Sequence, residues 1–124
     1  MTRVTICTIA AVSAVGVGGA VTQASGAPDT TLKLRAAASG ALKFNKTTLR
    51  AEPGKVTIRL RNPSSAGKPH AVEVEGKGVE KESATIDPGE RTSLTVRLRE
   101  GRYEFYCPVG NHQAEGMEGT LIVR

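Results

Sequence analysis

The feature that most constrains the fold is a strict alternation of apolar and polar residues in two segments, Lys55–Arg61 and Thr92–Arg99. Successive side chains of a β-strand point to opposite faces, so a period of two predicts strands with one buried face. The apolar positions expected on the buried faces are Val56, Ile58 and Leu60 in the first segment and Leu94, Val96 and Leu98 in the second. From Leu32 onward no segment shows a sustained helical period, which indicates an all-β domain.

Turn signals separate these runs from further short apolar segments. Glu52-Pro53-Gly54 and Asp87-Pro88-Gly89 each place Pro where φ is preset and Gly where a positive φ is tolerated. The Glu100-Gly101 connection predicts that Thr92–Arg99 and Arg102–Cys107 pair as a hairpin. The other candidate strands are Thr31–Ala37, Leu42–Phe44, Thr47–Ala51, His70–Glu75, Ser83–Ile86 and Gly119–Arg124. Many short strands between frequent turns are typical of a β-sandwich.

The N-terminus has the pattern of an export signal. Residues 4–21 form an uncharged, mostly apolar run after Arg3, and small residues follow it. We therefore predict a signal peptide over residues 1–27, a linker over 28–31 and one domain over 32–124. The alternative is an uncleaved membrane anchor, because the run is near the lower length limit for crossing a bilayer.

Charge and aromatic content argue against a nucleic-acid partner. The formal net charge of +5 comes from 17 basic and 12 acidic residues, and the basic residues are scattered through the predicted strands. Aromatic residues make up only 3% of the chain and there is no Trp, so stacking platforms for bases are missing. The length allows one small core, and we expect a monomer.

The mature domain has a single cysteine. Cys7 lies in the predicted signal peptide, which leaves Cys107 alone and excludes an internal disulfide. Idle exposed thiols are oxidised in exported proteins, so a lone cysteine calls for a partner chain or for a chemical use of its sulfur. Metal ligation is such a use.

Four side chains form a candidate metal site. Cys107, His112 and Met117 lie within eleven residues after a predicted strand, and His70 is the only other histidine. A thiolate, two imidazoles and a weak thioether suit one copper ion that cycles between Cu(I) and Cu(II).

Other interpretations of these residues use fewer of them. Structural zinc sites are built from Cys and His without a thioether. A cysteine nucleophile with His112 as its base explains neither Met117 nor His70. Cys107 alone could be a small buried apolar residue in a metal-free sandwich that acts in adhesion.

The spacing Cys107-x4-His112-x4-Met117, preceded by Tyr-Glu-Phe-Tyr and followed by Glu-Gly-Thr-Leu-Ile-Val, resembles the C-terminal ligand loop of the cupredoxins. This superfamily of type 1 (blue) copper proteins includes plastocyanin, azurin and rusticyanin, and the four-residue gap between Cys and His is more like rusticyanin and sulfocyanin. The residues before His70 resemble the first-histidine loop. The resemblance covers Leu32 to Arg124 and implies a Greek-key β-sandwich. It also implies that His70, Cys107 and His112 are equatorial copper ligands and that Met117 is the axial ligand.

One position departs from the family pattern. Many cupredoxins have an Asn after the first His that ties the two ligand loops together, and Ala71 stands there in this chain. The backbone N–H of Ala71 can still donate to the Cys107 sulfur, and such donors tune a metal site. Pro108 has no N–H to donate.

The resemblance implies a single-electron carrier and not an enzyme, since protein groups fill all four coordination positions and a catalytic metal normally keeps one open. We expect transient redox protein partners and an extracytoplasmic location: periplasmic, secreted or on the outer face of the cell membrane. Membrane attachment is expected only if residues 1–27 are retained. The alternative function is copper storage or delivery to another enzyme.

Electrons are expected to pass through the edge of His112, and Tyr106 is expected to be a surface feature beside the metal. The small or apolar neighbours expected around His112 are Pro69, Pro108, Val109 and Ala114.

Overall fold

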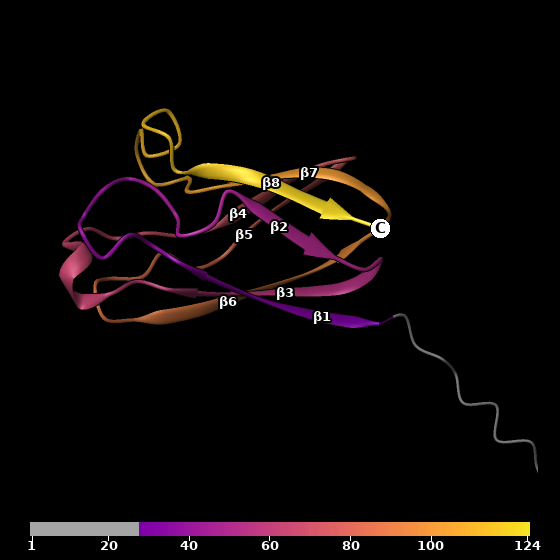
Figure 1. Ribbon diagram of the computed structural model, residues 1–124, viewed down its shortest axis with the longest axis horizontal. Coiled ribbons are helices and arrows are strands. Elements are labelled where there is room, and N and C mark those ends of the chain that lie inside the picture. Colours follow the sequence, from indigo (N-terminus) through magenta and orange to yellow (C-terminus); the bar gives the residue numbers. More distant parts are fainter. Residues whose placement is uncertain (1–27) are drawn as a thin grey trace, which may run out of the picture.

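The computed structural model describes residues 28–124, which form two β-sheets packed face to face (Figure 1). One sheet has three strands in the order β1-β3-β6, and the other has five in the order β2-β8-β7-β4-β5. The strands are β1 (Asp29–Arg35), β2 (Thr48–Ala51), β3 (Gly54–Arg61), β4 (Glu73–Gly76), β5 (Val79–Glu82), β6 (Arg91–Leu98), β7 (Gly101–Tyr106) and β8 (Glu118–Val123). A short 3-10 turn, η1 (Ser64–Ala66), follows β3. The predicted all-β sandwich is confirmed.

The core lies between the two sheets, where the alternating strands direct their apolar side chains. The predicted inward residues of β3 and β6 are all buried, and Phe105 from β7 and Leu121 from β8 meet them from the opposite sheet. Removing these branched side chains from water supplies the main driving force for closing the sandwich.

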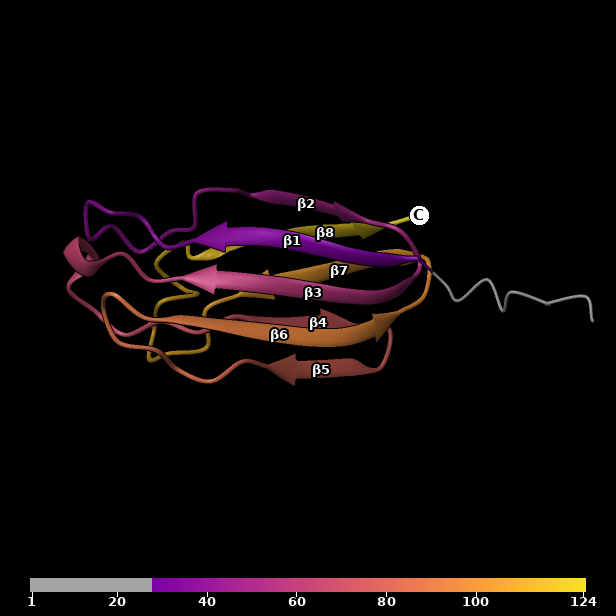
Figure 2. The ribbon, with the colours of Figure 1, turned by 90° about the horizontal axis from the view of Figure 1, so that it is seen from below.

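The chain crosses repeatedly between the sheets, as the expected Greek-key arrangement requires. β1 pairs in parallel with β3, and β2 pairs in parallel with β8. All other strand pairs are antiparallel. Figure 2 shows the two sheets as layers, with β1, β3 and β6 in front.

The predicted hairpin of residues 92–99 with 102–107 is wrong, because β6 and β7 belong to different sheets. Each strand carries an apolar face that must be buried, and placing them in opposite sheets lets the two faces meet across the core. The connection from β6 to β7 is held by a hydrogen bond of 2.8 Å that the Tyr103 hydroxyl donates to the Arg99 carbonyl. Gly101 makes the turn with a φ of 151°.

Three predicted strands also differ from the structure. The predicted strands over 42–44 and 83–86 contribute only the isolated bridges of Ala36 with Phe44 and of His70 with Ile86. The strand expected from His70 begins at Glu73. β5 was not predicted, because its Val-Glu-Lys-Glu sequence is mostly exposed and lacks an apolar alternation.

The hairpin of β4 and β5 is set by its turn. Lys77 and Gly78 both have positive φ, 48° and 80°, which is the geometry of a tight two-residue hairpin turn.

β1 begins at Asp29, so its first three residues fall in the stretch that the sequence assigned to a linker. The predicted signal peptide, residues 1–27, lies outside the described residues. Within residues 28–124 there is no helix long and apolar enough to cross a membrane.

Candidate metal centre

The four predicted metal-binding residues come from two segments at one end of the sandwich. Cys107 directly follows β7, Met117 directly precedes β8, and His112 lies in the loop between them. His70 comes from the segment between η1 and β4, where its backbone exchanges two hydrogen bonds with Ile86 at 3.0 and 2.8 Å. The ends of the sheets therefore fix where each segment enters the site.

The loop that holds Cys107, His112 and Met117 is closed by its own backbone. The N–H of Cys107 donates to the Met117 carbonyl at 3.0 Å, and the N–H of Met117 donates to the His112 carbonyl at 3.1 Å. A third bond, from the His112 N–H to the Val109 carbonyl at 3.1 Å, tightens the turn before the imidazole. These backbone bonds hold the three residues together without help from a metal.

Both imidazoles face the sulfur. The Sγ of Cys107 lies 3.5 Å from Nδ1 of His112 and 3.9 Å from Nδ1 of His70. One possible ligand atom from each of the three residues lies within 4.8 Å of the others. Bonds of about 2.0 Å to nitrogen and about 2.3 Å to sulfur at 120° would separate the nitrogen and sulfur atoms by about 3.7 Å. The observed distances therefore fit a shared metal ion.

The candidate ligands are buried, which favours the neutral forms of their titratable groups. His70, Cys107 and Met117 have no exposed surface, and His112 is 9% exposed. Burial, followed by the charges of His112 and Lys68, lowers the pKa of His70 to about 4. Burial and the charge of Lys68 also lower the pKa of His112. Both imidazoles are therefore neutral near pH 7, which is the form that binds metal.

The sulfur is the group that must lose a proton when metal binds. Burial raises the pKa of the Cys107 thiol, and hydrogen bonds from the backbone N–H groups of Ala71 and Val109 oppose that rise. The donor at Ala71 is the one that the sequence suggested. Two backbone donors toward the sulfur help to hold a thiolate in place.

Asn62, which no sequence pattern singles out as part of the site, supports the His70 segment. Asn62 is fully buried, and its Nδ2 donates to the carbonyls of Lys68 at 2.7 Å and Ile86 at 3.1 Å. Ile86 is also the backbone partner of His70, so Asn62 ties the loop before His70 to the segment that pairs with it. The signal available in the sequence is an Asn-Pro pair directly after a strong strand pattern, which marks a turn but no partner.

The expectation that Tyr106 is a surface feature is wrong. Its side chain is only 9% exposed, and its hydroxyl donates to the Glu75 carboxylate at 2.9 Å. Burial raises the pKa of Tyr106, and the hydrogen bond to Glu75 adds to that rise. The neighbouring strands fold their acidic side chains around the ring, a contact across strands that the local sequence does not reveal.

The fold and the site together define a copper protein of the cupredoxin class. Residues 31–124 match the copper-binding proteins of the plastocyanin/azurin family. The chain belongs to this family, and copper is its cofactor.

Solved structures with the same fold include other members of this class. Auracyanin B is 24% identical, with a TM-score of 0.69 over 79% of this chain and 90% of that chain. The dithionite-reduced auracyanin of Roseiflexus castenholzii is 20% identical, with a TM-score of 0.69 over 80% of this chain and 99% of that chain. A copper nitrite reductase from Nitrosomonas europaea is 22% identical, with a TM-score of 0.65 over 77% of this chain and 41% of that chain. A comparison with curated protein sequences finds no match.

Proposed function

We propose that this protein is an exported type 1 copper protein that carries single electrons between redox partners. The observation that carries the proposal is the convergence of one sulfur and two neutral imidazoles in a buried cluster at one end of the sandwich. A bound copper ion would supply the one-electron chemistry by changing between Cu(I) and Cu(II).

The chain's own residues would hold that ion in a nearly fixed environment. His70, Cys107 and His112 would hold it through Nδ1, Sγ and Nδ1. Met117, whose backbone is bonded to both Cys107 and His112, would supply its thioether as the fourth ligand. Ligands that are fixed by backbone hydrogen bonds and excluded from water move little when the charge of the ion changes, which favours fast electron transfer.

Burial supports a carrier over an enzyme. Four protein groups would leave the ion no open position for a substrate. His112 is the one candidate ligand with exposed surface, at 9% against 0% for the other three. Its edge is therefore the natural route for an electron between the ion and a partner.

The surface around His112 suits brief contacts. Pro69 and Ala114 are exposed, and Pro108 and Val109 are half-buried. A small apolar surface of this kind supports weak and short-lived protein complexes, as carriers need. Export through the N-terminal segment would place the protein and its partners outside the cytoplasm.

The test is to load the protein with Cu(II), record the visible spectrum and measure the reduction potential by cyclic voltammetry. We expect an intense blue Cu–thiolate band and reversible reduction. Cys107→Ala should abolish the colour, and Met117→Leu should keep it while raising the potential, because a weaker axial ligand favours Cu(I).

The matched control is Ser83→Ala, which removes a buried polar group outside the ligand set and should leave the colour unchanged. A colourless wild type with full copper occupancy would contradict the proposal. A protein that binds only Cu(I) and releases it readily to a chelator would point to copper storage or delivery.

A further inference from the structure

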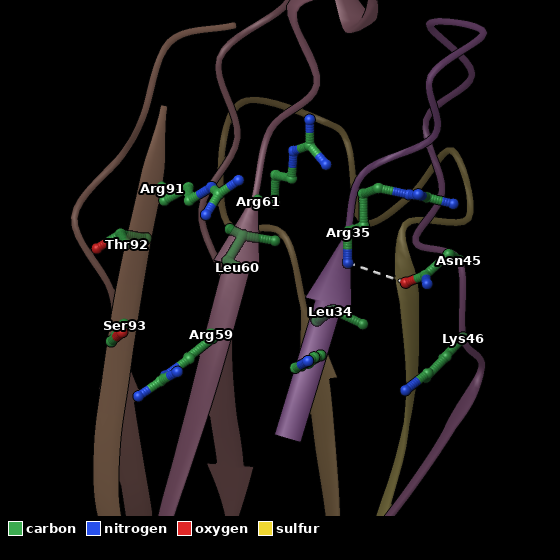
Figure 3. Close-up of a pocket in the computed structure, with 11 residues that line it drawn as sticks. Leu34, Arg35, Asn45, Lys46, Arg59, Leu60, Arg61, Arg91, Thr92 and Ser93 are labelled. Atoms are coloured by element: carbon green, nitrogen blue, oxygen red, sulfur yellow. Dashed lines mark hydrogen bonds between the residues drawn. The ribbon is translucent and has the colours of Figure 1, made fainter. Parts of the chain in front are cut away.

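The outer face of the three-stranded sheet contains a hollow lined by cations (Figure 3). Its volume is about 740 Å³, and β1, β3 and β6 form its floor, with residues 45–46 at one side. No carboxylate lines it within residues 28–124. The six basic side chains of this basic hollow are Lys33, Arg35, Lys46, Arg59, Arg61 and Arg91.

These cations have no protein partners in the described part of the chain. The one ion pair within residues 28–124 joins Lys55 to Asp29, and no side chain of the basic hollow donates a hydrogen bond there. All six side chains are exposed. Each guanidinium therefore keeps five free donors in the planar fork that suits carboxylates.

The strand register places like charges directly opposite each other. Lys33 pairs with Arg59, Arg35 with Arg61, and Arg61 with Arg91. Directly opposed like charges destabilise a sheet, so this arrangement does not serve the stability of the free protein. An external group of negative charge would relieve the repulsion.

Part of the other sheet has the opposite charge on its outer face. Glutamates pair with one another across β4, β5 and β7: Glu73 with Glu82, and Glu75 with both Glu80 and Glu104. The molecule therefore has a basic hollow on one sheet and a group of glutamates on the other. A charged partner is steered toward one sheet and repelled by the other.

The basic hollow lies toward the metal end of the sandwich. Arg61 is the last residue of β3, and the next residue is Asn62, which bonds the carbonyls of Lys68 and Ile86 beside His70. Lys68 adds a positive charge near the metal site, where it contributes to the lowered pKa of both histidines. The basic hollow and the metal site thus lie toward the same end of the sandwich, the hollow on the three-stranded sheet and the loop of His112 on the side of the five-stranded sheet (Figure 1).

We propose that the basic hollow is the electrostatic docking surface for a redox partner protein with an acidic surface. The inference rests on the proposed carrier function. Exposed, flexible cations around an open hollow give long-range attraction and rapid release, which suits a protein surface more than a tightly held small anion. An anionic membrane is less suitable, because the cations surround a hollow and the surface of a bilayer is flat (Figure 3).

The test compares two triple variants of the copper-loaded protein. R59E/R61E/R91E reverses three charges of the basic hollow, and R97E/R99E/R102E reverses three exposed arginines near the far end of β6. The two variants have the same net charge. Reduction of the Cu(II) protein is followed by stopped flow with two reductants: reduced flavodoxin, a small acidic electron-transfer protein, and ferrocyanide, a small anion.

For flavodoxin we expect R59E/R61E/R91E to lower the second-order rate about tenfold at low salt, which is a modest steering effect. R97E/R99E/R102E should lower it less than threefold. The ratio of the wild-type rate to the R59E/R61E/R91E rate should shrink as ionic strength rises from about 0.01 M to about 0.15 M, because the Debye length falls from about 30 Å to about 8 Å. The spectrum and potential should be the same in all three proteins.

Equal losses in the two variants would overturn the proposal, since only net charge would then matter. A loss with ferrocyanide but none with flavodoxin would show a small-anion site instead. A loss of co-sedimentation with phosphatidylglycerol vesicles in R59E/R61E/R91E, with flavodoxin rates unchanged, would show a membrane-binding surface. A wild type that neither reductant reduces would refute the carrier function itself, and rates that ignore the position of the charges would refute only the docking surface.

Discussion

The two ends of the sandwich are built in different ways. At the end away from the metal site, short turns join β2 to β3, β4 to β5 and β6 to β7, and glycines at positive φ make each turn. At the metal end, longer segments carry buried polar groups: Asn62, His70 and Cys107 (Figure 1). Local backbone preference fixes the first end, whereas the second depends on hydrogen bonds between distant segments.

The largest expected effect is a loss of stability in acid that arises at the metal end of the sandwich. Below pH 6.5 the unfolded chain protonates His70, while the folded protein, with a pKa of about 4, does not. The free energy of unfolding of the metal-free protein should therefore fall by about 3 kcal/mol as the pH drops from 6.5 to 4. The lowered pKa of His112 acts in the same direction.

Urea unfolding of the metal-free protein at several pH values between 7 and 4 measures this loss. Gln does not titrate in this range, so in His70→Gln the unfolding free energy should fall much less between pH 6.5 and pH 4. An equally steep slope in His70→Gln would mean that the acid sensitivity arises elsewhere in the sandwich.

The next largest effect should come from Asn62→Ala. The change removes a part-buried hydrogen bond to the Lys68 carbonyl and a buried one to the Ile86 carbonyl, which together should cost about 2 kcal/mol of unfolding free energy. Because Asn62 supports the His70 segment, the variant should also release copper faster to a chelator.

Asn45→Ala is the matched control. Asn45 accepts one exposed hydrogen bond from the Arg35 N–H at 2.9 Å, so its loss should cost less than about 1 kcal/mol. If Asn62→Ala loses stability but releases copper at the wild-type rate, then Asn62 stabilises the fold without supporting the metal site.

The smallest effect should come from the hydroxyl of Tyr103 at the crossing between β6 and β7. Tyr103→Phe removes one bond of 2.8 Å to the Arg99 carbonyl and should cost about 1 kcal/mol without changing the reduction potential. Tyr106→Phe removes a bond of 2.9 Å to Glu75 next to Cys107, and it should shift the potential as well. Thermal unfolding and voltammetry of both variants check these expectations. A changed reduction potential in Tyr103→Phe would show that the end away from the metal site also influences the metal.

The predictability of each part follows the same division. The strands with a strong alternation, β3 and β6, and the set of four candidate ligands were accessible because their signals lie in local sequence. The pairing of β6 was not, since an apolar face can be buried equally by a neighbour in its sheet or by the opposite sheet. β5, Asn62 and the burial of Tyr106 depend on cross-strand contacts, which a short sequence window does not contain.

The parallel pairing of β2 with β8 has a consequence for the order of events during biosynthesis. Residues 48–51 find their partners only at residues 120–123, in β8. A contact of such long range forms late, and it cannot form before residues 120–123 have been synthesised. Met117 immediately precedes β8, so the loop that joins Cys107 to Met117 closes only after the seven strands before it in the described chain have been made. Assembly of the candidate metal ligands is therefore a late event that follows synthesis of most of the sandwich.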